Sequence, residues 1–186
     1  MLQDLTGKLL IAMPGIGDSQ FSRALVLVCA HEEDYAMGIA LNKPIDDLTL
    51  PQLLTQLGIE QDIRLPDNAV LNGGPVGTDR GFVVHTNDFH SEGATMDIGH
   101  DCCLTATRDI LVAIASGEAP RESIMALGYS GWDAGQLEDE IADNAWIIGE
   151  AIPDLLYGAE HESKWGRALD LLGVDASRLH SGGGSA

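Results

Sequence analysis

Short apolar runs that end near glycine, proline or asparagine constrain the fold of this 186-residue chain more than any other feature. Residues 7–13, 24–30 and 36–41 have the length and hydrophobicity of buried strands, and Pro44 closely follows the third run. Proline lacks a backbone donor, and glycine adopts conformations that other residues avoid. We therefore expect many short strands joined by tight turns.

Further strands are predicted in the middle and the second half of the chain. The candidates are residues 70–71, 81–85, 94–98, 102–105 and 146–149. Residues 123–129 also favour a strand, although a turn of buried helix fits this apolar run equally well. The glycine-rich segment 130–135 is interpreted as a turn.

Apolar residues recur at helical spacing in four segments. These are residues 50–57, a segment from Thr105 or Thr107 to residue 115, residues 136–143 and residues 163–172. Thr49 can cap the first helix, whereas residues 154–157 favour only a short turn. The helices are scattered between strands, so the pattern predicts an α+β fold with a mixed sheet or partial barrel and peripheral helices.

No repeat or low-complexity linker divides the chain. We therefore expect one domain over residues 1–180, followed by a disordered Gly/Ser tail at residues 181–186.

The chain is strongly acidic, with 29 Asp and Glu residues against 10 Lys and Arg residues and a formal net charge of −19. This charge repels the phosphates of nucleic acids and of anionic lipids, which disfavours direct binding to either. The amino terminus lacks the basic and apolar segments of a secretory signal, and no stretch of 18 residues is apolar throughout. We therefore expect a cytoplasmic protein that does not bind a membrane.

Potential metal ligands and thiols follow no known pattern. Four candidate ligands lie close together in the sequence, namely His85, His90, His100 and Cys102, but their spacing matches no standard site. His161 and Glu162 begin an HExxH motif in which Trp165 stands where the second histidine belongs. We predict no metal ion and no cofactor. Cys29, Cys102 and Cys103 form no even set and no CxxC motif, so free thiols are expected; the reactivity of Cys102 and Cys103 stays open.

Two segments begin like functional motifs but are incomplete. Gly15 and Gly17 resemble the start of a dinucleotide-binding fingerprint, but Gln20 replaces its third glycine. Ser130 lies in a segment similar to a nucleophile elbow, but Trp132 stands in place of the final glycine. A structural turn is the commoner explanation for each segment.

Three of the few cations, Arg23, Lys43 and Arg80, lie beside the predicted turns. A cation in a strongly negative protein is a suitable anchor for a small anionic ligand. Pairing with neighbouring carboxylates is the commoner arrangement. The available carboxylates are Asp18, Asp46 and Asp79.

The segment 136–143 carries a run of acidic residues, Glu138, Asp139, Glu140 and Asp143. We interpret this run as the solvated face of a helix. The alternative is a docking surface for a basic protein partner, which would bind with a steep dependence on salt.

Several segments, taken in order, resemble the successive signature blocks of the YqgE/AlgH family of bacterial proteins. They are GKLLIAMP, GDSQF, MGIALNKP, LNGGPV, RGFVVH, TATRDIL, ALGYSGWDAGQLEDEIADNAW and KWGRALDLLGVD. The resemblance extends from residue 5 to about residue 174 and implies an α+β fold whose mixed, bifurcated sheet is bent into a pseudo-barrel. The family is described as transcriptional regulators without established catalytic residues. This chain ends in Gly-Ser-Ala, where the family frequently has Gly-His-Ala.

These observations favour a non-enzymatic regulatory protein that acts indirectly, through a protein partner or a small anionic ligand. The groove expected to hold the ligand lies at the glycine and proline turns and comprises Asn42, Lys43, Gly73, Gly74, Pro75 and Arg80. The alternative is an unrecognised enzyme for a small anionic substrate, held by Arg80 and Lys43, with Ser130 or His85 as the reactive group. A purely structural scaffold is a third hypothesis. The enzyme hypothesis requires these four side chains to converge on one pocket.

Overall fold

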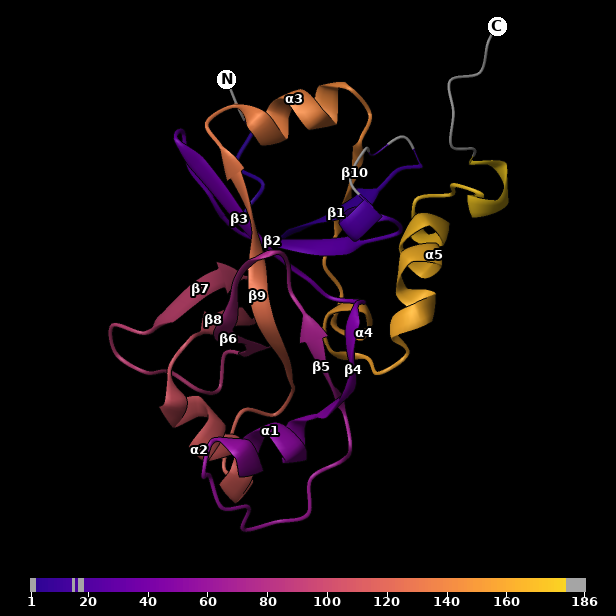
Figure 1. Ribbon diagram of the computed structural model, residues 1–186. Helices are drawn as coiled ribbons and strands as arrows, with labels where there is room; N and C mark the ends of the chain where they lie inside the picture. The colour runs from indigo at the N-terminus through magenta and orange to yellow at the C-terminus, as the bar shows by residue number, and fades with distance from the viewer. Residues whose placement is uncertain (1–2, 15, 17–18, 180–186) are drawn as a thin grey trace, which may run out of the picture.

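The computed structural model describes residues 3–14, 16 and 19–179, which form a ten-stranded sheet surrounded by helices (Figure 1). The strands are β1 (Lys8–Ala12), β2 (Leu25–His31), β3 (Tyr35–Ala40), β4 (Pro44–Thr49), β5 (Ala69–Asn72), β6 (Val76–Thr86), β7 (Thr95–Gly99), β8 (Cys102–Thr105), β9 (Ser123–Asp133) and β10 (Trp146–Glu150). The α-helices are α1 (Leu50–Gln56), α2 (Arg108–Ser116), α3 (Gln136–Ala142), α4 (Pro153–Tyr157) and α5 (His161–Leu171). No helix in this part of the chain is long and apolar enough to span a bilayer.

The sheet is mixed, branched and curled into a half-barrel, which confirms the predicted fold class. Eight strands follow the order β10-β1-β2-β3-β9-β6-β8-β7, with antiparallel neighbours. The other two strands leave this path, because β5 pairs parallel with β9 and antiparallel with β4. Figure 1 shows β9 running between the two halves of the sheet.

The sheet branches along one strand, β9, which has three partners. Its first half pairs with β5 through Leu71 and Ala126, and its second half pairs with β3 through Gly38 and Ser130. Its remaining partner is β6, in a register that shifts between Val76 and Gly81. One long strand therefore joins both halves of the molecule.

Glycines occupy the point where the chain after β5 crosses β9. The Gly73 backbone donates to the Leu127 carbonyl at 2.8 Å and accepts from Ala40 at 2.9 Å, so this turn links β9 to β3. A Cβ atom on Gly73 would lie 2.3 Å from the Gly128 carbonyl oxygen, and one on Gly74 would lie 2.2 Å from the Tyr129 carbonyl carbon. Side chains therefore cannot be accommodated at this crossing.

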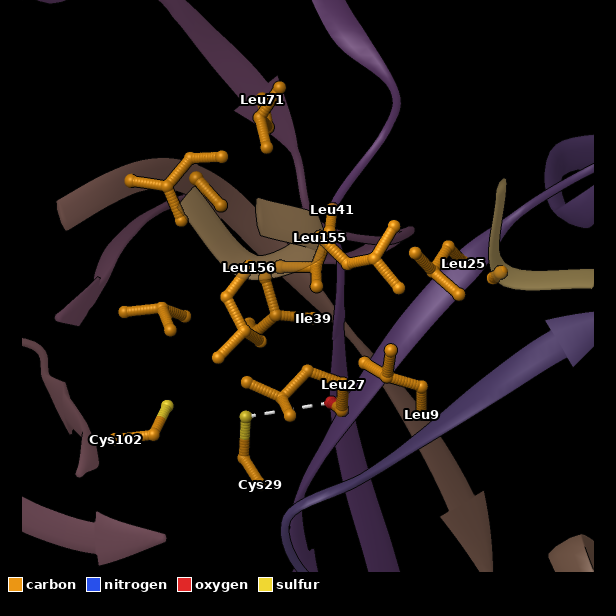
Figure 2. Close-up of a cluster of buried hydrophobic side chains, with 14 of the residues drawn as sticks. Leu9, Leu25, Leu27, Cys29, Ile39, Leu41, Leu71, Cys102, Leu155 and Leu156 are labelled. Carbon is orange, nitrogen blue, oxygen red and sulfur yellow. Dashed lines mark hydrogen bonds between the residues drawn. The ribbon is translucent and has the colours of Figure 1, made fainter. Parts of the chain in front are cut away.

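Helices cover both faces of the sheet, so side chains that point to either face of a strand are buried. Leu9 and Ile11 of β1 belong to a core cluster that includes Leu155 and Leu156 of α4 (Figure 2), whereas Leu10 belongs to a second cluster with Trp132 and Trp146. A third cluster packs α1 and α2 against β5, β6 and β9.

Free thiols, as expected, are found at Cys29, Cys102 and Cys103, all of them buried. The Cys29 thiol donates to the Leu27 carbonyl at 3.6 Å (Figure 2). Burial raises the pKa of Cys102 to about 11, and it also raises the pKa values of the other two thiols. These shifts disfavour the reactive thiolate form.

The structure corrects three of the predicted elements and adds one strand. The predicted turn at residues 130–135 is wrong, because β9 continues to Asp133 while paired with β3. Residues 44–49 form a strand, β4, that was not predicted, and β6 begins at Val76 rather than at Gly81. The predicted turn at 154–157 belongs to a short helix, α4. The Thr49 cap is confirmed, since its Oγ1 accepts from the Gln52 backbone at 3.3 Å.

A directional hydrogen-bond chain lies between β6, β7 and β8. His85 Nδ1 donates to the Thr86 carbonyl at 2.7 Å, because a carbonyl can only accept. In the neutral imidazole Nε2 therefore accepts from Thr105 Oγ1 at 2.7 Å, and Thr105 accepts in turn from Thr95 at 2.8 Å. The Thr95 hydroxyl accepts from the Ser91 backbone at 2.8 Å, so every donor has an acceptor.

The glycine crossing yields a first prediction, that Gly73→Ala will lower the free energy of unfolding by about 3 kcal/mol, because the backbone atoms that it meets cannot move aside. Gly166→Ala is the control, since Gly166 lies within α5 with no neighbouring atom inside 4 Å and should gain up to about 1 kcal/mol of helix propensity. Urea unfolding of both variants measures the difference. Equal stabilities would show that the crossing is not tightly packed.

The hydrogen-bond chain yields a second prediction, that His85 stays neutral below its usual pKa of about 6.5. Burial is the main cause of its lowered pKa, opposed by the Thr86 carbonyl and Asp88. The unfolded chain then binds a proton that the folded chain does not. The contribution of neutral His85 to the free energy of unfolding is therefore fully present above about pH 6.5. As the pH decreases from there to the pKa of His85 in the folded protein, the free energy of unfolding falls by at most about 1.4 kcal/mol per pH unit.

Imidazole NMR shifts of the folded protein, compared with those of a peptide spanning residues 81–89, test this prediction. Titration of His85 at or above the pKa of the peptide would contradict it.

Candidate functional site

An open cavity of about 540 Å³ lies between β3, β6, β7, β8 and β9. Most of its lining is apolar, and the main side chains are Tyr35, Met37, Phe82, Met96, Leu104, Tyr129 and Trp132. The Phe82 and Tyr129 rings pack edge to face with centroids 5.7 Å apart. The cavity has the size and composition of a small-molecule site.

Large apolar side chains are exposed around this cavity. Tyr35 is 47% exposed, Met96 is 44% exposed and Val76 is 41% exposed, and all three line it. Single exposed apolar residues are common on proteins, but a group of them around one cavity marks an interaction site.

One cation, Arg80, lines the cavity together with one carboxylate, Asp133. The Arg80 guanidinium lies over the Phe82 ring, with its carbon 5.5 Å from the ring centroid. Among the described residues Arg80 forms no ion pair, so the pairing with Asp79 that the sequence left open does not occur. Its charge therefore stays available to a ligand.

Two other predicted ligand-binding residues, Asn42 and Lys43, hold the corner between β3 and β4. Asn42 accepts from the Leu25 backbone at 2.9 Å and donates to the Arg23 carbonyl at 2.8 Å. Lys43 donates to the Ser22 carbonyl, and burial, followed by the charge of Arg23, lowers its pKa. Neither side chain lines the cavity.

The predicted turn residues Gly73 and Gly74 are buried at the crossing with β9, and Pro75 is exposed beside them. Of the six residues predicted to form one groove, Arg80 alone lines the 540 Å³ cavity. The Gly15 and Gly17 segment, together with Asp18, lies outside the described residues.

The groups of the enzyme hypothesis do not share a pocket. Ser130 is fully buried and donates to the Gly73 carbonyl at 3.3 Å. His85 is fully buried within the hydrogen-bond chain described above, and Lys43 lies at the β3–β4 corner. Only Arg80 faces the cavity, so these four residues give no geometric basis for catalysis. The described residues contain no cluster of three or more His, Cys, Asp or Glu side chains that could hold a metal ion.

The acidic run on α3 has structural roles that the sequence did not reveal. Glu140 Oε1 accepts from the Trp132 indole at 3.1 Å and from the Trp146 indole at 2.9 Å. Glu138 contacts His31 Nε2 at 2.5 Å, and this hydrogen bond is the main cause of the lowered pKa of Glu138. These two carboxylates therefore fasten α3 to the sheet.

Sequence reasoning found Arg80 but missed the apolar lining of the cavity. Tyr129, Gly131 and Asp133, at every second position of β9, line the cavity, as expected for a strand with one face toward it, and Trp132 between them also contributes to the lining. This alternation was the available signal, and the glycines in the segment obscured it.

Comparisons with known proteins agree with the fold and the sequence blocks. A family model described as AlgH-like matches residues 9–177. A UPF0301 protein from Caulobacter vibrioides is 49% identical over 183 residues, covering 98% of this chain and 94% of its own. A UPF0301 protein from Bradyrhizobium diazoefficiens is 49% identical over 189 residues, and the match covers 98% of this chain and 88% of that protein.

Two solved structures are similar to all or most of this chain. The AlgH protein from Pseudomonas aeruginosa has a TM-score of 0.76 and 38% identity and covers all of both chains. A protein from Corynebacterium diphtheriae has a TM-score of 0.69, with 89% and 85% coverage, and at 18% identity it supports the fold alone. The sequence blocks, the family model and the branched half-barrel together show that this chain belongs to the AlgH-like family.

Proposed function

We propose that this protein is a non-enzymatic binding protein whose cavity between β3, β6 and β7 holds a small amphipathic anion. The observation that carries this proposal is an apolar cavity with a guanidinium on its wall that forms no ion pair with any described residue. The apolar body of the ligand packs against the aromatic and methionine side chains, and its anionic group contacts Arg80. The regulatory role implied by the family resemblance then depends on ligand occupancy or on a protein partner.

The apolar part of the ligand contributes most of the binding free energy. Tyr35, Val76 and Met96 each expose close to half of their surface. Covering the exposed part of each side chain contributes on the order of 1 kcal/mol.

The charge on Arg80 supplies selectivity more than affinity. Arg80 is exposed, so water and salt weaken its attraction for an anion, and the contact contributes about 1 kcal/mol, or roughly a fivefold change in affinity. The net charge of −19 disfavours anions elsewhere on the surface. Arg80 therefore selects anionic amphipaths over neutral ones of similar shape.

The third prediction concerns a fluorescent probe, anilinonaphthalene sulfonate, which combines an aromatic body with one anionic group. We expect Arg80→Gln to weaken its binding about fivefold, because the sulfonate loses its cation. The neutral probe N-phenyl-1-naphthylamine should bind the variant and the unchanged protein alike. Arg64→Gln, which removes an exposed arginine that does not line the cavity, is the matched control and should change neither affinity.

A second variant separates the cavity from other apolar surfaces that bind such probes. Gly131 lines the cavity, and a Cβ atom on it would lie 3.7 Å from the Tyr129 ring, an ordinary contact, so Gly131→Ala adds a methyl group there without a backbone clash. Both probes should bind this variant more weakly. Unchanged binding to both variants would place the probes elsewhere and overturn the proposal.

The fourth prediction concerns DNA. Because the net charge is −19, we expect no specific binding to fragments of promoter DNA, at about 0.15 M salt, below roughly 10 μM protein. Fluorescence anisotropy over a range of salt concentrations measures this. Tight and sequence-specific binding would contradict the indirect mode of action while leaving the ligand site to be judged by the probe experiment.

A further inference from the structure

A second cationic feature lies on α5, away from the cavity. His161, Lys164 and Arg167 follow one another at intervals of three residues, so they lie along one side of the helix. Figure 1 shows α5 on the outside of the molecule, and it packs against β1 and β2. None of the three residues lines the cavity between β3, β6 and β7.

Lys164 is fully buried, which is rare for a lysine. Its ammonium group has three donors, and the hydrogen bond found for it runs to the Leu41 carbonyl at 3.0 Å. Burial is the main cause that lowers its pKa to about 8, and the charge of Arg167 lowers it further. Lys164 and Arg167 are therefore close enough to repel each other.

The Arg167 guanidinium has one satisfied end and one unsatisfied edge. Its Nη1 donates to Asp154 Oδ2. Its Nε and Nη2 atoms are buried without a hydrogen-bond partner in the described structure, and so is His161 Nδ1. Nε and Nη2 form the edge of a guanidinium that donates two parallel hydrogen bonds to a carboxylate or phosphate.

The charges around this cluster do not balance. Asp154 is the carboxylate that stabilises the charged form of Lys164, and it already pairs with Arg167. Glu160 acts on His161, whose pKa is lowered mainly by burial and next by Lys164. Two cations therefore share one close carboxylate, and a buried excess charge is unfavourable unless an opposite charge joins it.

We propose that this side of α5 binds an oxyanion group, a phosphate or a carboxylate, free or as part of a larger metabolite. The Nε–Nη2 edge of Arg167 donates to two of its oxygens, and Lys164 supplies the neutralising charge. In a protein with a net charge of −19, such a group binds only where cations are concentrated. The site is separate from the cavity of the proposed function, so each can fail without the other.

The fifth prediction tests this site with inorganic phosphate as the probe. Thermal unfolding in sodium phosphate is compared with unfolding in sodium chloride at equal ionic strength and pH 7. We expect the unfolding midpoint to rise by about 5 °C once phosphate exceeds its dissociation constant roughly 100-fold. The Arg167 Nε–H signal in a ¹⁵N–¹H spectrum should move during the same titration.

Two variants and a control assign the effect to the cluster. Lys164→Met removes the buried charge at similar length, and Arg167→Lys keeps a charge but removes the two-donor edge. Each should weaken phosphate binding at least about tenfold. Arg178→Gln, at an exposed arginine in the 3-10 helix Ala176–Arg178, should bind phosphate like the unchanged protein. If Lys164→Met does not fold, Arg167→Lys decides the question.

Sodium acetate separates the two forms of the ligand. Stabilisation by phosphate but not acetate identifies a phosphate group, and stabilisation by both identifies a general oxyanion site. Equal midpoints in phosphate, acetate and chloride, with no movement of the Arg167 signal, would overturn the proposal. A response that is the same in both variants and the unchanged protein would also overturn it.

Discussion

The close backbone crossing of the turn after β5 with β9 is the constraint on which the rest of the structure depends. Gly73 and Gly74 touch the β9 backbone at Gly128 and Tyr129, at distances that leave no room for a Cβ atom. This contact lets β9 pair with β5 in its first half and with β3 in its second half. The half-barrel and its cavity follow, because β3 and β6 are both held by the same strand.

Local sequence patterns predicted the elements whose periodicity is strong, such as β2, α1 and α2, together with the α+β class. They did not predict the second half of β9, because its strand conformation depends on pairing with Tyr35–Gly38, almost a hundred residues earlier in the chain. The same separation hid the lining of the cavity, which five strands supply. Tertiary pairing overrode the local preference of Ser130 and Gly131 for a turn.

The candidate site likewise includes one residue that the local sequence indicated and others that only the folded structure brings together. Arg80 could be singled out from the sequence, since a cation is rare in this chain and lies beside a glycine turn. The other five residues proposed from the same reasoning have contacts or positions outside the cavity, and the glycines serve a backbone crossing. A glycine-rich turn thus indicates a close approach of atoms, which another part of the chain provides as readily as a ligand.

The two cationic features differ in the physical reason for binding an anion. Arg80 is solvated, so it loses little when its ligand leaves, and apolar contacts must supply most of the affinity for that ligand. Lys164 is fully buried, and two Arg167 donors are buried without partners among the described residues, so these groups lack the solvation that would replace a departing anion. We therefore expect a ligand at Arg80 to exchange readily, whereas an oxyanion at α5 stabilises the fold that holds it.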